Sequence, residues 1–581
     1  MKKTYTFNHN PLLSDRLPQW RARFVLILLL AGSCTLVGRA MYLQGVNKDF
    51  LQRKGESRYA RTLELPANRG KVTDRHGDTL ATSTPVKSIF AIPDLVKASP
   101  AELVQLARAL ELDPREVRRK LDSGKDYVFL ARGVSPDLAE RALALKLPGV
   151  QAQQEFRRYY PSGEMASHLV GFTNVDDRGQ EGIELAFNSD LTGQSGSRRV
   201  IQDRRGQIVE DVETMQRPQD GRDVQLALDA KIQYLAYSAL KQAVQTNKAK
   251  AGAAVVLDAR TGEVLALVNS PTFNPNNRKG LSGEQLRNRV MTDSFEPGST
   301  MKPFIAAMAL ESSRFRADSM IDTQGGKLTI DGATIGDSHG GGGMMSVAQV
   351  IQKSSNVGAA KIALAFPPQH MWQLYDTLGF GQPLKLGFPG EVGGRLRPWK
   401  TWRPIEQATM AYGHGVSVTM MQLAHAYMVF ARDGELVPLS LTRVEAPALH
   451  GKQVFSPEVA RQVRAMLETV TQPGGTAVRA QVPGYRVAGK TGTAYKLVNG
   501  QYTNKYLSSF VGFAPASNPR LIVAVAIDEP GGAQHFGGDV AAPVFSQVVA
   551  GSLRALGIQP DAPIVPMQVA QQKVNPVKED M

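Results

Sequence analysis

The sequence is poor in the residues that hold disulfides, metals and phosphates. Its 581 residues include one cysteine, Cys34, which excludes an intramolecular disulfide and any paired-cysteine metal or redox site. Nine histidines occur, but none belongs to an H-E-x-x-H pattern. The glycine-rich run Gly340–Gly343 is not followed by Lys-Ser or Lys-Thr, so it does not match a phosphate-binding loop. We therefore expect no metal and no cofactor.

Long hydrophobic runs are equally scarce, since only Phe24 to Gly38 qualifies. If Arg39 extends its charged end outward, the stretch from 24 to 45 forms a helix of roughly 33 Å, long enough to cross a bilayer. One acid precedes it, Asp15, among a set of basic residues: Lys2, Lys3, Arg16, Arg21 and Arg23. This excess predicts a cytoplasmic N-terminus (1–23), a single transmembrane helix (24–45) and a body on the far side of the membrane.

Two other interpretations of the N-terminus fit less well. A cleaved signal peptide needs small residues at a cleavage site, and no A-x-A follows the apolar run. A lipoprotein site is suggested by Ala31-Gly32-Ser33-Cys34, but the usual leucine is missing and apolar sequence continues. The net charge of +15 suits nucleic acid, an anionic membrane or acidic substrates equally, so it selects none of them.

The rest of the chain divides into two folded parts and a tail. Residues 46–220 begin with a charged linker to about residue 60 and continue as a mixed α/β unit, with helical spacing from Ala101 to Leu147. Residues 221–558 open with a strand at 224–228, a helix at 230–245 and a hairpin formed by 253–257 and 264–268, and close with a helix at 543–556. This order predicts an α+β domain with an antiparallel sheet packed between helices. The polar, proline-containing residues 559–581 are expected to be disordered.

A serine nucleophile and its base are indicated by Ser299-Thr300-Met301-Lys302. The breaker Pro297-Gly298 precedes an apolar helical pattern, so Ser299 belongs at a helix N-terminus. Residues three apart share a helix face, which places the Lys302 amine beside the Ser299 hydroxyl. Partial burial would lower the pKa of that lysine and make it a general base.

Two further motifs complete a catalytic set. Ser354-Ser355-Asn356 supplies a hydroxyl that could pass a proton and an amide that could bind a peptide backbone. Lys490-Thr491-Gly492-Thr493, in a strand expected from Val487 to Ala494, supplies a charge and two hydroxyls suited to a peptide that ends in a carboxylate. S-x-N and K-T-G each occur once, and their order after S-x-x-K is specific.

Each motif alone also has a structural interpretation. Ser354-Ser355-Asn356 could cap a helix that continues through Ile362, and residues 490–493 could form an ordinary edge strand. S-x-x-K occurs a second time, at Ser238-Ala239-Leu240-Lys241. That copy lies in the middle of a predicted helix, where we expect the hydroxyl to face a packed helix rather than a cleft.

These three motifs resemble the signature of the penicillin-binding proteins and serine β-lactamases. Further segments are similar to the pedestal of the class B penicillin-binding proteins: Arg69-Gly70, Asp74-Arg75-His76-Gly77, Leu80-Ala81, Arg158 to Glu164, Gly171 to Asn174 and Gly182-Ile183-Glu184. The resemblance extends from the membrane helix to about Leu556, and Lys353 to Gly358 resembles the division-specific transpeptidase of Gram-negative bacteria. It implies an elongated pedestal that precedes a penicillin-binding transpeptidase domain.

The resemblance also implies roles for individual residues. Ser299 would take the acyl group from a D-alanyl-D-alanine stem peptide, Lys302 would act as base, and Ser354 and Asn356 would line the cleft. The K-T-G segment would hold the carboxylate of the donor or of a β-lactam, and the N–H groups of Ser299 and Thr493 would form an oxyanion hole. The family implies the inner membrane, a periplasmic body, and partners among membrane glycosyltransferases and other division proteins, with no nucleic acid.

Several alternatives stay open at this point. A carboxypeptidase or β-lactamase would form the same acyl-enzyme but use water as the acceptor. A β-lactam sensor or silent scaffold should carry more than one membrane span. An elongation-specific transpeptidase would catalyse the same reaction. A bifunctional synthase is disfavoured because residues 46–220 lack a catalytic glutamate cluster. Where the family pattern predicts Tyr-Gly-Tyr-Gly, this chain has Tyr412-Gly413-His414-Gly415, and His535-Phe536 stands at a candidate aromatic wall.

Overall fold

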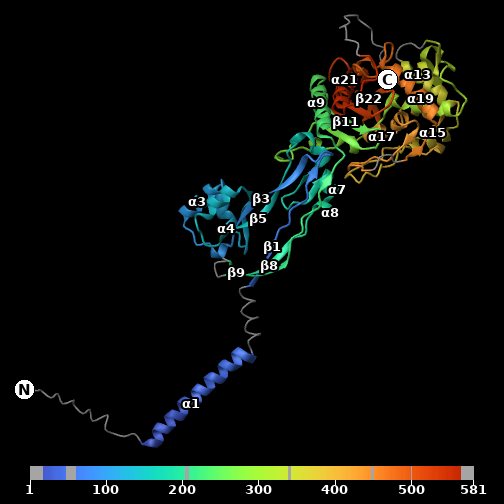
Figure 1. The fold of residues 1–581 in the computed structure, drawn as a ribbon. Coiled ribbons are helices and arrows are strands. Elements are labelled where there is room, and N and C mark those ends of the chain that lie inside the picture. The colour runs from blue at the N-terminus through green and yellow to red at the C-terminus, as the bar shows by residue number, and fades with distance from the viewer. Residues whose placement is uncertain are drawn as a thin grey trace, which may run out of the picture. The chain divides into compact units, whose positions relative to one another are not determined.

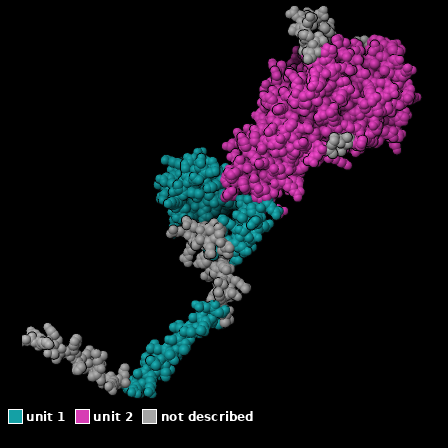
Figure 2. All heavy atoms as spheres, viewed as in Figure 1, with its two compact units in different colours: residues 1–66, 87–153, 195–219 teal, residues 67–86, 154–194, 220–581 magenta. Residues whose placement is uncertain are grey.

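The fold is taken from a computed structural model that describes residues 18–46, 60–202, 208–337, 342–445, 450–498 and 500–563. The chain forms two compact units, shown in Figure 2, and each combines segments far apart in the sequence. Unit 1 comprises residues 1–66, 87–153 and 195–219, and unit 2 comprises residues 67–86, 154–194 and 220–581. Unit 2 thus includes parts of the predicted pedestal, and the boundary at residue 220 stays a prediction. Most of the predicted linker (47–59) and tail (564–581) lies outside the described residues.

One helix in the described residues is long and apolar enough to cross a membrane. It is α1 (Gln19–Met41), and a π-helical turn continues it over Tyr42–Val46. None of its side chains is buried. The helix fits a single-pass membrane anchor, as the apolar run predicts, although it begins at Gln19 rather than at residue 24.

Unit 1 contains an antiparallel sheet and a small α/β layer. The sheet has the order β1 (Ala60–Leu65), β8 (Gly196–Gln202) and β9 (Ile208–Gln216). The α/β layer contains α3 (Pro100–Ala109), α4 (Pro114–Leu121), β4 (Val128–Val134) and α5 (Pro136–Leu143). Each helix starts with a proline that follows a capping Ser or Asp side chain. Strand β4 interrupts the predicted helical stretch, because a short apolar run does not reveal its own period.

The pedestal motifs of unit 2 converge on one buried carboxylate. Glu184 accepts from Arg69 Nε at 2.7 Å and from Arg158 Nε at 2.6 Å, and all three side chains are almost completely buried. Arg69 also donates to the Glu184 carbonyl at 2.8 Å. Near this network, β2 (Val72–Thr73) pairs with β10 (Val224–Gln225) and with β3 (Thr79–Ala91). Three of the pedestal segments that resemble the family, those that contain Arg69, Arg158 and Glu184, therefore meet in a buried ionic network.

The larger part of unit 2 is built on a five-stranded antiparallel sheet. Its spatial order is β12 (Val264–Ser270), β11 (Ala251–Asp258), β23 (Leu521–Asp528), β22 (Gln501–Ala514) and β21 (Ala488–Val498). The strands are almost wholly buried where they pair, since α9 (Ala230–Thr246) and α21 (Ala542–Ala555) cover one side and α17 (Met420–Ala426) the other (Figure 1). The predicted helix–sheet–helix arrangement is confirmed.

A helical layer lies next to strand β21 and carries the other two motifs. Its helices are α12 (Lys302–Glu311), α13 (Val347–Lys353), α14 (Asn356–Leu364), α15 (Pro368–Thr377), α16 (Pro404–Met410) and α19 (Pro457–Thr471). Helix α12 contacts α14 and α19, and α19 packs against β21. Because β21 is the edge strand of the sheet, one side of it is left for this layer and for a ligand.

Candidate active site

Ser299 lies in a tight turn that leads into a buried helix. The turn is a 3₁₀ segment, Gly298–Met301, and the α-helix proper begins at Lys302. Gly298 has φ of +59°, and the backbone of Gly413 packs so closely on it that a Cβ at residue 413 would lie 2.2 Å from the Gly298 carbonyl oxygen. The Tyr427 hydroxyl donates to the Thr300 carbonyl at 2.8 Å. The helix N-terminus expected at Ser299 therefore exists, with a 3₁₀ first turn held by its neighbours.

Two buried lysines meet on the hydroxyl of Ser354. Lys302 Nζ lies 3.1 Å from Ser354 Oγ, and Lys490 Nζ lies 2.8 Å from the same oxygen. Lys302 also donates to the Ser354 carbonyl. The two lysines and Ser354 have no exposed surface. Segments separated by 52 and 136 residues in the chain thus come together at one point.

Ser354 reaches this position through an unusual backbone conformation. It ends α13 in the left-handed region, with φ of +61° and ψ of +38°, which is uncommon for a residue with a side chain. The next residue, Ser355, caps α14 by accepting from the Gly358 N–H at 2.9 Å. One motif therefore both caps a helix and contributes to the site, because Ser355 caps α14 and Ser354 contacts the two lysines.

Asn356 is anchored by one side of its amide. Its Nδ2 donates to the Gly336 carbonyl at 3.1 Å, and its buried Oδ1 has no hydrogen-bond partner among the described residues. Asp337 fixes the start of α14, accepting from Ser355 Oγ at 2.6 Å and from the Val357 N–H at 2.9 Å. The motifs give no sign of Asp337, since it comes from an unrelated loop.

The K-T-G segment lies in β21, which runs further than predicted, to Val498. The hydroxyls of Thr491 and Thr476 lie 2.7 Å apart, and Thr493 Oγ1 accepts from the Gly537 N–H at 3.1 Å. A Cβ on Gly492 would lie 2.5 Å from Ser509 Oγ and 2.9 Å from the Pro297 carbonyl oxygen. Glycine therefore lets this strand pack directly on the turn that carries the nucleophile.

A group of polar aromatic residues adjoins the Ser299 turn. The His414 ring stacks on Tyr502 with centroids 5.9 Å apart and meets Tyr412 edge-on at 5.2 Å. Burial is the main cause that lowers the pKa of His414 to about 4. Glu296 accepts from the Gly415 N–H at 2.8 Å and from the Tyr502 hydroxyl at 3.0 Å, while burial raises its pKa. The sequence gives no signal for Tyr502 or Glu296.

The second S-x-x-K copy is not a site, although one expectation about it was wrong. Ser238 is exposed on α9 rather than turned toward a packed helix. Lys241 donates to Tyr237 at 2.8 Å and to Glu164 at 3.2 Å, so its amine forms a surface network. No group of three or more His, Cys, Asp or Glu that could hold a metal occurs in the described part of the chain.

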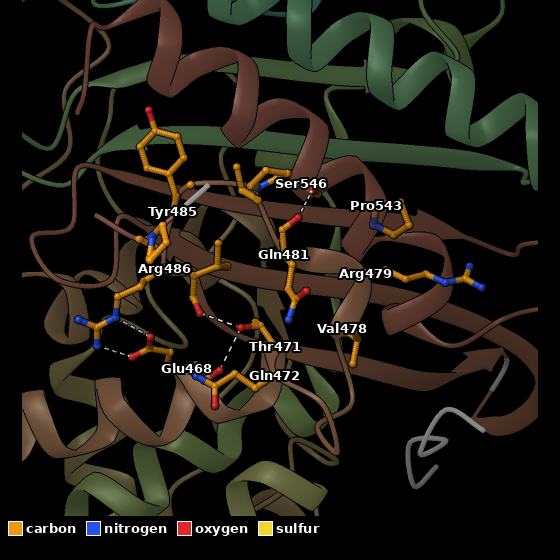
Figure 3. A pocket seen from close by; sticks show the side chains of 16 residues that line it. Glu468, Thr471, Gln472, Val478, Arg479, Gln481, Tyr485, Arg486, Pro543 and Ser546 are labelled. Atoms are coloured by element: carbon orange, nitrogen blue, oxygen red, sulfur yellow. Dashed lines mark hydrogen bonds and ion pairs between the residues drawn. The ribbon is translucent and has the colours of Figure 1, made fainter. Parts of the chain in front are cut away.

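A larger cavity lies in another part of unit 2, away from the three motifs. This cavity of about 1100 Å³ is lined by residues from α19, from the chain between α19 and β21 (residues 478–487), and from α21 (Figure 3). The ion pair between Glu468 and Arg486 lies on one side of it and Arg479 on the other. None of the three motifs lines this cavity, so the chemistry and not the volume identifies the candidate active site.

Comparisons with known proteins agree with the geometry. Family models described as "Penicillin binding protein transpeptidase domain" and "Penicillin-binding Protein dimerisation domain" match residues 252–550 and 64–226. The probable peptidoglycan D,D-transpeptidase PenA of Neisseria gonorrhoeae is 44% identical over 550 residues, which cover 94% of each chain. The peptidoglycan D,D-transpeptidase FtsI of Escherichia coli (strain K12) is 42% identical over 551 residues, 94% of this chain and 93% of the relative.

A solved structure is also similar. It is the apo structure of the TP domain from Burkholderia pseudomallei penicillin-binding protein 3, with 52% sequence identity and a TM-score of 0.54. The match covers 58% of this chain and 98% of that one.

Proposed function

Because this chain belongs to the class B penicillin-binding proteins, we propose that it cross-links peptidoglycan stem peptides through an acyl-enzyme on Ser299. The chain is a serine-type peptidoglycan D,D-transpeptidase, and the alternatives of hydrolase and sensor are not favoured. The observation that supports the assignment of the site is the pair of buried amines on the Ser354 hydroxyl.

Lys302 is the proposed base. Two buried ammonium groups on one hydroxyl repel each other and lose hydration, and both effects favour the uncharged form of one amine. In that form Lys302 takes the proton of Ser299 as the Ser299 oxygen bonds to the penultimate D-alanyl carbonyl carbon. The N–H groups of Ser299 and Thr493 bind the resulting oxyanion.

Ser354 connects the base to the leaving group. As the peptide bond breaks, the nitrogen of the terminal D-alanine needs a proton, which passes from Lys302 through the Ser354 hydroxyl. D-alanine then leaves, and the acyl group stays on Ser299. The amine of a neighbouring stem peptide attacks this ester, gives its proton back along the same route and restores the serine. Lys490, Thr491 and Thr493 hold the donor carboxylate, while Asn356 Oδ1 accepts from the peptide backbone.

Product analysis tests transfer against hydrolysis. The full-length protein in detergent is incubated with a D-alanyl-D-alanine donor peptide and an excess of an amino-acid acceptor. The proposal predicts the acceptor-linked peptide and free D-alanine, with no product from the Ser299→Ala variant. Hydrolysed donor alone, at every acceptor concentration, would identify a carboxypeptidase and contradict the proposal.

The division role, the orientation and the partners are further parts of the proposal. FtsI of E. coli is similar along almost the whole chain, which supports a septal role. Arg21 and Arg23 at the start of α1 support a cytoplasmic N-terminus, an inner-membrane location and a periplasmic body. Glycan polymerisation would then fall to a membrane glycosyltransferase in the division machinery. A fluorescent fusion that labels the side wall instead of the septum would favour the elongation alternative.

A further inference from the structure

The cavity of about 1100 Å³ in Figure 3 takes no part in the proposed catalysis. Its apolar lining consists of Val478, Val482, Pro483, Val487 and Pro543. The charged groups of the lining already have partners, since Arg486 Nε lies 2.7 Å from Glu468 and Arg479 Nη1 lies 3.7 Å from Asp539. Its volume suits a small ligand or a few residues of peptide. The cavity therefore favours an occupant that is apolar and uncharged.

The end of the described chain forms part of the cavity wall. Ala562 and Pro563, the last two described residues, belong to its lining. Asp561 holds this end in place, because its N–H donates to the Gly484 carbonyl at 3.1 Å and its carboxylate accepts from the Arg486 N–H at 2.7 Å. The residues that follow Pro563 therefore begin at the cavity.

The sequence that follows matches the chemistry of the lining. It reads Ile564-Val565-Pro566-Met567, and no charge occurs before Lys573. Four extended residues span at most about 13–14 Å. Pro566 has no N–H to satisfy in an apolar site, and it biases Val565 toward an extended backbone, so less conformational entropy is lost when the segment is ordered.

Polar groups are available for the backbone of such a segment. The side-chain amides of Gln472 and Gln481 belong to the lining, and Figure 3 shows them between the Glu468–Arg486 ion pair and Arg479. Each amide can donate to a carbonyl and accept from an N–H. An extended apolar segment can therefore enter without leaving all of its peptide groups unpaired.

We propose that this cavity is a docking site for the chain's own C-terminal segment, residues 564–567. Because the segment is joined to the wall at Pro563, its effective concentration at the cavity is high, and weak apolar contacts suffice to hold it. The docked segment lies beside Val487, which directly precedes β21, and so supports the start of the strand that carries Lys490. This inference does not rest on the proposed function.

The accessibility of a thiol in the lining tests the proposal. Cys34→Ser removes the only native thiol, and Val478→Cys then places one at the cavity, where the valine is 40% exposed. The rate of labelling with fluorescein maleimide is measured on the full-length protein in detergent. Each rate is divided by that of Ser238→Cys, an exposed position on α9, in the same form of the chain. This division removes differences in reagent and preparation.

Ending the chain after Pro563 should raise the ratio about tenfold, as expected if the segment covers the thiol for roughly nine-tenths of the time. The double variant Ile564→Asp/Val565→Asp in the full-length chain should raise it similarly, because a carboxylate without a partner is costly to bury. Val574→Asp, an equal change of charge outside the segment, is the matched control and should leave the ratio unchanged.

Three results would overturn the proposal. The first is the same ratio in the complete chain and in the chain that ends after Pro563. The second is a rise in Val574→Asp as large as that in Ile564→Asp/Val565→Asp. The third is protection that disappears when the protein is diluted, which would assign the cavity to the C-terminal segment of a second copy.

Discussion

At the scale of single residues, the site depends on adjacent side chains that do different work. Ser354 lies between the two buried lysines, and Ser355 beside it caps α14 and contacts Asp337. Ser354 itself adopts the left-handed backbone conformation between α13 and α14, and the capping position falls to Ser355.

Substitution of each serine separates these two tasks. Ser354→Ala should lower the rate of penicillin acylation by about 10²-fold or more, because the proton route is lost. Ser355→Ala should lower the free energy of unfolding by about 1 kcal/mol, as expected for a lost cap, with a smaller effect on acylation. Rates from stopped-flow labelling and unfolding curves from the same preparations check both. Equal rate losses in the two variants would contradict a proton-transfer role specific to Ser354.

A buried histidine in unit 2 links stability to pH. His168 donates from Nε2 to the Gln285 carbonyl at 2.8 Å, and burial lowers its pKa from 6.5 to about 4. Between these values the unfolded chain binds more protons than the folded one, so stability is full above pH 6.5 and falls as the pH drops toward 4. The loss attributable to this group is at most about 3 kcal/mol. The free energy of unfolding in urea, measured at pH 7 and pH 5, should depend less on pH in His168→Gln than in the wild type. The exposed His370→Gln variant should show the wild-type dependence. The same pH dependence in the wild type and both variants would refute the role of His168.

At the scale of elements, the site is the contact between β21 and the 3₁₀ turn before α12. Gly492 permits that contact, because the space its side chain would occupy is filled by Ser509 and the Pro297 carbonyl. In the proposed mechanism, strand and turn must therefore keep a fixed separation so that the N–H groups of Thr493 and Ser299 can bind one oxyanion.

Adding one methyl group should disturb this separation. Gly492→Ala is expected to lower the acylation rate at least tenfold, since backbone must move to relieve contacts below 3 Å and oxyanion donors act only at short range. Gly283→Ala, which meets nothing within 4 Å, is the control. Stopped-flow labelling of both variants checks this, and an unchanged rate in Gly492→Ala would show that the strand can shift without loss of function.

The elements of this domain were largely predictable from local patterns. The helix predicted over 230–245 is found at Ala230–Thr246, and the hairpin at Ala251–Asp258 and Val264–Ser270. The first residues of strand β22, from Gln501 on, are largely polar and exposed, so the sequence shows no strand pattern there. Asp337 and Tyr502 could not be predicted as neighbours of the site, since only tertiary packing brings them to it. Glu296 is a neighbour through the chain itself, because it lies three residues before Ser299.

At the scale of the whole molecule, each compact unit is assembled from separate stretches of chain. Segments 67–86 and 154–194 contribute Arg69, Arg158 and Glu184 to one buried cluster of unit 2. Two arginines on one carboxylate leave a net positive charge. Further hydrogen bonds of the arginines help to stabilise it, including Arg69 to Thr192 at 2.9 Å and Arg158 to Ser83 at 3.1 Å.

Loss of the central carboxylate should destabilise this assembly. Glu184→Gln leaves two buried arginines without their counter-charge, and we expect a loss of about 3–5 kcal/mol in the free energy of unfolding. Glu181→Gln, an exposed neighbour without an ion pair among the described residues, is the control and should be near neutral. Urea unfolding of both variants checks this; equal stabilities would show that the cluster contributes nothing net.

The most direct measurement is mass spectrometric mapping of the residue that penicillin modifies. The full-length protein is labelled with a fluorescent penicillin, digested and sequenced beside the Ser299→Ala variant. One adduct, on the peptide that contains Ser299, and none in the variant is the predicted result. An adduct on any other residue, or undiminished labelling of Ser299→Ala, would contradict the account.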